Sequence, residues 1–166
     1  MVWTGPSSAS VPVRSMAAVL EDVINEARSE LVIMTYSARR YEPLRAALAA
    51  AIARGVAVDV VVETLTGAGS ALSGSEPATA FAGLQGVNLW HLPTRNRTTA
   101  GAKMHAKLAI ADGKTLLVSS ANLTQSGVSD SLEAGLLVRG GTAPERALEY
   151  VRDLQARGLL QRLIVH

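Results

Sequence analysis

The 166-residue chain contains no cysteine. Disulfides, thiolate zinc sites, iron–sulfur clusters and a cysteine nucleophile are therefore excluded. Aromatic residues make up only 4% of the chain, whereas hydrophobic residues of all kinds make up 48%. The core must accordingly be built from Ala, Val, Leu and Ile, and platforms on which single-stranded bases could stack are scarce.

The sequence also lacks a long apolar run and a strong imbalance of charge. No apolar run approaches the roughly 20 residues that a membrane-spanning helix needs, and the N-terminus lacks the basic-then-apolar layout of a secretory signal. We therefore expect a cytoplasmic protein without a membrane partner. The 16 Lys and Arg against 14 Asp and Glu give a formal net charge of +2, so only local clusters of charge can indicate a nucleic-acid partner.

The length fits one compact domain spanning residues 1–166, and no segment has the character of a linker or an internal repeat. Hydrophobic periodicity predicts helices that alternate with strands. The predicted helices cover residues 14–29, 42–54 and 143–157, with a short one at 77–84, and the predicted strands cover residues 31–35, 56–62, 87–92, 104–111, 115–119 and 132–139. This order predicts an α/β fold, with a mixed, mostly buried β-sheet flanked by helices on both faces.

One predicted hairpin carries a distinctive set of polar residues. Its two strands meet at Asp112-Gly113, a dipeptide that strongly favours a tight turn. On the first strand, His105 and Lys107 are two residues apart and should project from the same face. Ser120 and Asn122 show the same spacing just past the second strand. Pairing of the strands would bring these four side chains together at one end of the sheet.

These residue types suit the chemistry of a phosphate group. A neutral imidazole can attack phosphorus, and an adjacent ammonium can neutralise a non-bridging oxygen. The hydroxyl of Ser120 and the amide of Asn122 can hold the other oxygens. Taken singly, each residue has a plainer explanation, as a structural histidine, a solvated lysine or a strand-end cap. Their joint spacing favours a phosphate site that needs neither a metal nor a cofactor.

The hairpin resembles the signature of the phospholipase D superfamily, H-x-K-x-x-x-x-D followed after six residues by G-S-x-N. His105, Lys107, Asp112, Ser120 and Asn122 occupy the matching positions. The resemblance implies an α-β-α sandwich and a covalent phosphohistidine formed on the catalytic histidine. For Asp112, its place at the turn favours a structural role over direct chemistry.

Two further positions bear on this resemblance. Glu133 lies where members of the superfamily commonly carry a glutamate that orients the catalytic histidine. Ser119 replaces the usual glycine, and a side chain there could crowd a bound phosphate. The superfamily needs two signatures for each active site, but neither His91 nor His166 is followed by a lysine at the right spacing. The resemblance therefore implies a homodimer that brings His105 of each chain to one phosphate.

Looser motifs resemble the phospholipase D-like component of the bacterial DISARM anti-phage system. They are V-W-T-G-P near the N-terminus, residues 32–40, W-H-L-P, and S-S-A-N-L-T through L-E-A-G-L-L-V. This resemblance covers most of the chain. It implies a role in anti-phage defence, with other defence-system proteins as partners.

A basic loop favours a nucleic acid, most simply DNA, as the substrate. Arg95, Arg97 and Lys103 precede the strand that carries His105, and Arg39 and Arg40 could extend the same surface. The ordinary explanation is that loops are charged for solubility. Two other functions remain open: hydrolysis or transfer of phospholipids, for which the chain shows no amphipathic membrane helix, and a non-catalytic binding or assembly module, which the serine at position 119 would favour.

Overall fold

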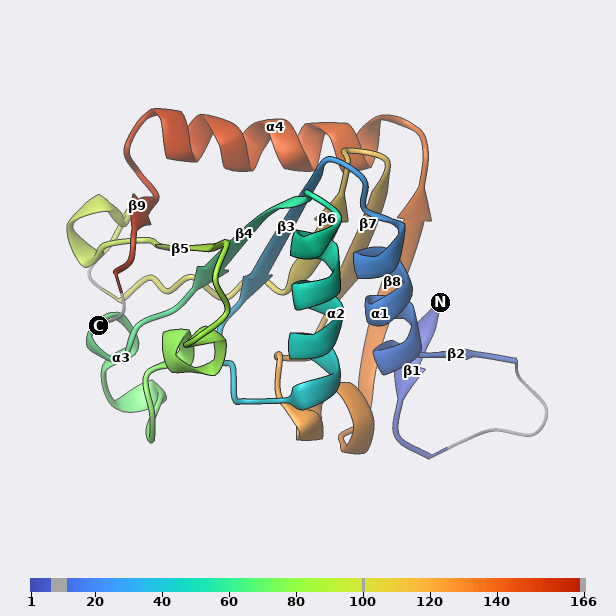
Figure 1. The fold of residues 1–166 in the computed structure, drawn as a ribbon. Helices are drawn as coiled ribbons and strands as arrows, with labels where there is room; N and C mark the ends of the chain where they lie inside the picture. Colours follow the sequence, from blue (N-terminus) through green and yellow to red (C-terminus); the bar gives the residue numbers. More distant parts are fainter. Residues whose placement is uncertain (7–11, 100, 165–166) are drawn as a thin grey trace.

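The computed structural model describes residues 1–6, 12–99 and 101–164 (Figure 1). Its strands are β1 (Val2–Thr4), β2 (Arg14–Ser15), β3 (Glu30–Thr35), β4 (Ala57–Val62), β5 (Val87–His91), β6 (Leu108–Ala111), β7 (Thr115–Ser119), β8 (Glu133–Arg139) and β9 (Gln161–Arg162). They form one sheet in the order β2-β1-β8-β7-β6-β3-β4-β5-β9. The central β3, β4 and β5 are parallel, whereas β6, β7 and β8 pair antiparallel. The prediction of a mixed sheet is confirmed.

The helices are α1 (Met16–Glu26), α2 (Glu42–Ala53), α3 (Leu65–Ala68) and α4 (Thr142–Ala156). Shorter helical turns lie at Gly69–Ala71, Pro77–Phe81, Thr94–Asn96 and Ser126–Asp130. The apolar positions that predicted the first long helix are those that α1 buries against the sheet. None of the helices in the described ranges is long and apolar enough to cross a lipid bilayer.

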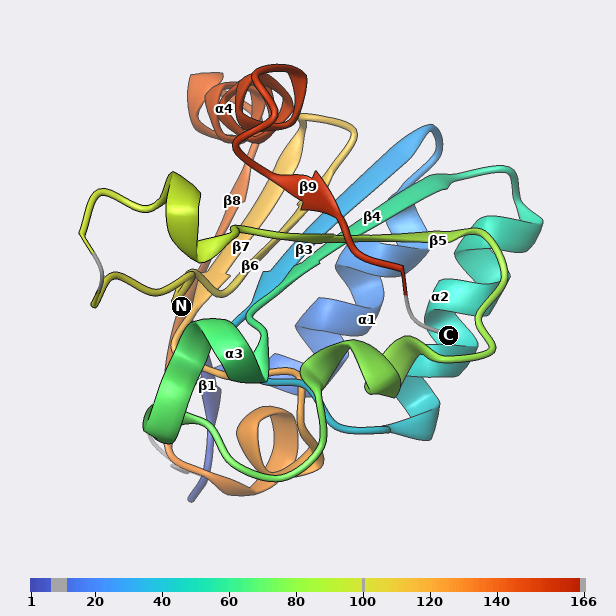
Figure 2. The ribbon, with the colours of Figure 1, turned by 90° about the vertical axis from the view of Figure 1, so that its left-hand side faces the viewer.

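Helices cover the two faces of the sheet to different extents. On one face, α1 and α2 pack over Ile33, Val60 and Ala109. On the other face, α4 packs through Val151 over a second cluster that includes Ile110. Figure 2 shows that α4 crosses only one end of this second face. The buried Met104 packs in the same cluster. An open part remains over β7 and β8, where the paired Val118 and Leu136 are 45% and 50% exposed.

The predicted strand over residues 104–111 is shorter in the structure and begins at Leu108. Leu108 pairs with Met34 of β3 and with Val118 of β7. Strands β3 and β7 each end one residue after these partners, at Thr35 and Ser119. The residues before Leu108 therefore have no strand to pair with, although the amide of Ser119 still donates to the carbonyl of Lys107. His105 therefore lies on a segment outside the sheet.

Three short strands were not predicted: β1, β2 and β9. They have 3, 2 and 2 residues, too few for an alternating pattern to be recognised. The predicted helix over residues 14–29 is also shorter, since its first two residues form β2 and Ala27 already has an extended backbone. Residues 5–12, a stretch rich in Gly, Pro and Ser ahead of the first predicted helix, lie mostly outside the described residues.

Candidate active site

His105 and Lys107 lie side by side although they are not in a strand. The Lys107 ammonium is 3.2 Å from Nδ1 of His105 and donates to the His105 carbonyl at 3.0 Å. The imidazole is exposed and packs on the ring of Tyr36, with the ring centroids 4.6 Å apart. Burial lowers the pKa of Lys107, and the negative charge of Glu133 works against that lowering. An exposed imidazole beside a fixed cation is the arrangement that attack on a phosphate requires.

Ser120 and Asn122 approach the same end of the sheet from β7. The Ser120 hydroxyl accepts from the amide of Ala134 at 3.1 Å and donates to the Glu133 carboxylate. The Asn122 Oδ1 accepts from the amide of Ser37 at 3.1 Å, which ties the residues after β7 to the loop after β3. The amide of Ser119 donates to the Lys107 carbonyl at 3.0 Å. Backbone and side-chain bonds thus connect the end of β7 to the Lys107 segment and to the loop after β3.

Glu133 differs from its implied role. The resemblance implies that Glu133 orients His105, but among the described residues its carboxylate contacts Ser120 instead. Its charge still acts on Lys107. In the single chain, Glu133 thus fixes the hydroxyl and balances the lysine rather than holding the imidazole.

Asp112 lies at the other end of β6 from His105. Its carboxylate accepts from the amides of Arg28, Ser29 and Glu30 at 2.8–2.9 Å and from the Ser29 hydroxyl at 2.8 Å. Partial burial by itself would raise the pKa of Asp112, but these hydrogen bonds outweigh it and lower the pKa below its ordinary value. Asp112 therefore joins the hairpin turn to the start of β3 and does not touch the other signature residues.

Ser119, the departure from the superfamily pattern, is accommodated within the sheet. It pairs with Gly135 of β8, so no side chain opposes it there. The Ser119 hydroxyl accepts from the amide of Ala121 at 2.9 Å. The polar atom of Ser119 is therefore used by the chain itself.

The basic loop divides into one buried and two exposed residues. Arg97 is 1% exposed in its side chain and forms an ion pair with the buried Glu63, so the prediction that Arg97 binds substrate is wrong. A guanidinium that is enclosed and fully bonded cannot contact a nucleic acid. Arg95 and Lys103 lie in exposed positions, where they donate to the side chain of Gln161 and the carbonyl of Ala68.

Tyr36 and Glu63 are site residues that the sequence did not predict. Tyr36 follows β3 and supports the imidazole, whereas Glu63 follows β4 and accepts from the amide of Met104, next to His105. A lone acidic residue at the end of a β-branched run was the available signal for Glu63. His91 lines a separate cavity of about 580 Å³, and burial lowers its pKa. His166 lies outside the described residues.

Comparison with known proteins identifies relatives. The family model described as "Cardiolipin synthase, PLD-like domain" matches residues 20–156. The DISARM protein DrmC of Bacillus paralicheniformis is 28% identical over 146 residues, which are 84% of this chain and 56% of that protein. The chain thus spans about half the length of this relative.

Solved structures share the fold. NucT from Helicobacter pylori has a TM-score of 0.69 at 17% identity, with 85% of this chain and 87% of that one covered. Nuc from Salmonella typhimurium, a phospholipase D family member, has a TM-score of 0.68 at 21% identity over 99% of this chain and 96% of that one. Phosphatidylserine synthase from Haemophilus influenzae has a TM-score of 0.68 at 16% identity, over 98% of this chain and 39% of that one.

Proposed function

The chain belongs to the family of phospholipase D-like domains described for cardiolipin synthase, and we propose that it cleaves or transfers phosphodiesters through a phosphohistidine formed on His105. The observation that carries this proposal is the exposed His105 imidazole with the Lys107 ammonium 3.2 Å from it. Ser120 and Asn122 follow β7, the strand next to β6. No step in this chemistry requires a cofactor.

The reaction has two steps. In the first, a ring nitrogen of His105 forms a bond to phosphorus while the bond from phosphorus to the leaving oxygen breaks. Lys107 balances the charge on a non-bridging oxygen, and a second histidine gives its proton to the leaving oxygen. In the second step, water loses a proton to that second histidine and attacks phosphorus, which breaks the bond to His105.

A second copy of the chain is the proposed source of the second histidine. Within the described ranges, the other histidine is His91, which lines a different cavity. The open part of the sheet face supports this proposal, since Val118, Leu136 and Trp3 are 45%, 50% and 39% exposed there, on strands that lead to the site. Apolar side chains exposed together commonly mark an interface. A two-fold axis near His105 would bury them and pair the two half-sites.

DNA is the proposed substrate. The exposed Arg95 and Lys103 lie on the loop that leads into the His105 segment, and a dimer would carry this pair twice. Such charges bind the phosphate backbone without reading sequence. A role in anti-phage defence, alongside other defence-system proteins, is proposed from the similarity to DrmC.

The test is cleavage of DNA and RNA by the purified protein in excess EDTA, with His105→Ala as the control. We expect the wild type to cleave DNA and the variant to be inactive. Equal activity in both would identify a contaminant and contradict the proposal. Vesicles that contain phosphatidylcholine or cardiolipin form the second arm, since phosphatidylserine synthase shares the fold. Cleavage of lipid alone would replace the nuclease assignment, and inertness on both would favour a binding module.

A further inference from the structure

The segment that carries His105 needs a support other than the sheet. Residues 102–107 have no strand pairing, and regular pairing resumes only at Leu108. The side chain of Met104 is buried against the second core cluster, which anchors the segment on one side. The amide of Met104 donates to Oε2 of Glu63 at 2.9 Å. The peptide group between Lys103 and Met104, one residue ahead of His105, is thus held by the carboxylate of a residue that follows β4.

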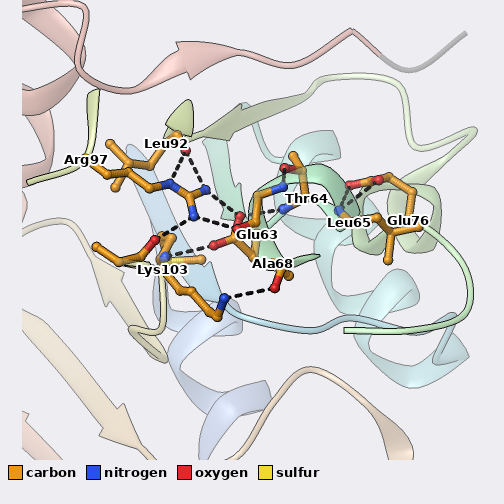
Figure 3. A network of polar contacts seen from close by, with 11 residues as sticks. Glu63, Thr64, Leu65, Ala68, Glu76, Leu92, Arg97 and Lys103 are labelled. Atoms are coloured by element: carbon orange, nitrogen blue, oxygen red, sulfur yellow. Dashed lines mark hydrogen bonds and ion pairs between the residues drawn. The ribbon is translucent and has the colours of Figure 1, made fainter. Parts of the chain in front are cut away.

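Glu63 also holds the loop that leads to this segment. Its Oε1 accepts from Nη2 of Arg97 and from the amide of Thr64, both at 2.8 Å. Arg97 in turn donates to the carbonyls of Gly67 and Ala102 at 2.8 Å. Figure 3 shows the Glu63 carboxylate between Thr64 just after the end of β4, Arg97 of the basic loop and the segment that follows Lys103. One buried ion pair therefore fixes the backbone at Ala102 and at Met104, just ahead of His105.

The ion pair is fully enclosed. Glu63 is 0% exposed and the Arg97 side chain 1% exposed. A Cβ on Gly67 would lie 2.3 Å from both Arg97 Nη2 and Glu63 Oε1, so only glycine leaves room for the pair. A buried ion pair is seldom more stabilising than apolar residues of the same volume. The burial of the Glu63–Arg97 pair is therefore better explained by the backbone that the pair positions than by a gain in stability.

We propose that Glu63 is a positioning residue for His105, because it holds the Met104 amide and so places the imidazole on Tyr36 beside Lys107. The inference rests on the proposed function for its consequence in catalysis. Its geometric part, that Glu63 sets where the imidazole lies, can be tested without any activity. Small displacements of a nucleophile lower the turnover rate far more than they weaken substrate binding.

Glu63→Gln is the sharpest substitution, because it keeps the size of the side chain. Two donors meet Oε1 and one donor, the Met104 amide, meets Oε2. The amide oxygen of glutamine should keep the position with two donors, which leaves its NH₂ group facing the N–H of Met104. We expect kcat for a chromogenic phosphodiester to fall roughly ten- to a hundredfold while KM changes little.

Glu63→Gln combined with Arg97→Met provides the rescue. Without the guanidinium, the carbonyls of Gly67 and Leu92 become acceptors on that side. The amide of Thr64 remains as a donor on that side, so the glutamine then faces one backbone amide at each position. Its NH₂ can turn toward the two carbonyls and its oxygen toward Met104, so kcat should recover in part although the ion pair is gone. The double variant also carries no uncompensated buried charge, which protects the test against misfolding of the single variant.

Asp59→Asn is the matched control. Asp59 is also on β4, is 7% exposed in its side chain and pairs with Arg152 of α4, but it has no contact with the His105 segment. This variant should lose stability without losing kcat. The urea midpoint of each variant separates loss of stability from loss of turnover.

Nuclear magnetic resonance of the His105 ring supplies a readout that is independent of activity. Glu63→Gln should shift the His105 ring signals, and Asp59→Asn should leave them in place. Unchanged His105 signals in Glu63→Gln would overturn the inference. So would a fall in kcat that is explained by the loss of stability to the same degree in Glu63→Gln and in Asp59→Asn. An inactive wild type with shifted His105 signals in Glu63→Gln would instead leave Glu63 as a positioning residue and remove the proposed enzymatic function.

Discussion

Ser119 of β7 lies opposite Gly135 of β8, so the serine that replaces the glycine of the superfamily signature meets a residue without a side chain. A Cβ on Gly135 would lie 3.2 Å from Cβ of Ser119 and 2.9 Å from the carbonyl of Val118. The serine is thus tolerated because its neighbour is glycine.

Gly135→Ala should therefore destabilise the protein by about 1–3 kcal/mol, the usual cost of overpacking. Ser119→Gly in the same chain should recover part of this loss, since one of the close contacts disappears. Urea denaturation of the wild type, the two single variants and the double variant measures the coupling energy between the two substitutions. Strictly additive effects would contradict the contact.

Asp112→Asn should destabilise the fold without changing turnover. The carboxylate accepts from three backbone amides at the start of β3, and loss of its charge should cost about 1–2 kcal/mol at this partly exposed turn. Activity at 25 °C, below the unfolding transition, should equal that of the wild type. A loss of kcat without a loss of stability would assign Asp112 a chemical role.

The same substitution should change how stability depends on pH. The pKa of Asp112 is lowered in the folded state, so its contribution is fully present above the unfolded value of about 3.9. That contribution is lost as the pH falls through the lower folded pKa. The difference in urea midpoint between wild type and Asp112→Asn should therefore shrink from pH 7 to acid pH. A difference that is independent of pH would contradict this.

The two arginines of the basic loop should behave differently. Arg95→Ala should change stability by less than about 0.5 kcal/mol. It should weaken the binding of every DNA sequence equally, and the slope of log binding constant against log salt concentration should become shallower by about 0.9 for each phosphate that is no longer neutralised. Arg97→Ala should cost about 3–5 kcal/mol, because Glu63 is left as a buried charge without a partner. Binding titrations at several salt concentrations and urea denaturation separate the two effects.

A site shared by two copies should respond to mixing in a characteristic way. If each active site needs His105 from both chains, activity after subunit exchange with His105→Ala should fall with the square of the wild-type fraction. The same mixture measured before exchange should give a linear dependence. A linear result after complete exchange would show that one chain suffices.

Leu136→Asp tests the surface proposed for this contact. Leu136 is 50% exposed, so the substitution should leave the single chain folded, but a carboxylate buried at an interface is costly. We expect a shift to monomer by light scattering together with loss of activity. Tyr150→Ala is the control, because Tyr150 is 65% exposed on α4 and its removal adds no charge. A dimeric and active Leu136→Asp variant would place the interface elsewhere.

Much of the fold followed from local patterns. Periodic apolar residues predicted the long helices, and β-branched runs predicted β3, β4 and β5, because burial of a repeating apolar face is a local property of the sequence. The Asp112-Gly113 dipeptide located the hairpin, and Asp112 has a positive φ of 52° there. The spacing of His105, Lys107, Ser120 and Asn122 identified the candidate site.

Tertiary structure alone decided how that site is supported. The length of β6 depended on where its neighbours end, and the environment of Arg97 depended on Glu63, which is 34 residues away in the chain. Arg95 and Arg97 look alike in sequence, yet one is exposed and the other buried. The sequence determined which groups could do the chemistry. Only the packing of distant segments determined which charges are enclosed and which face solvent, because burial at the end of a strand arises from long-range contacts.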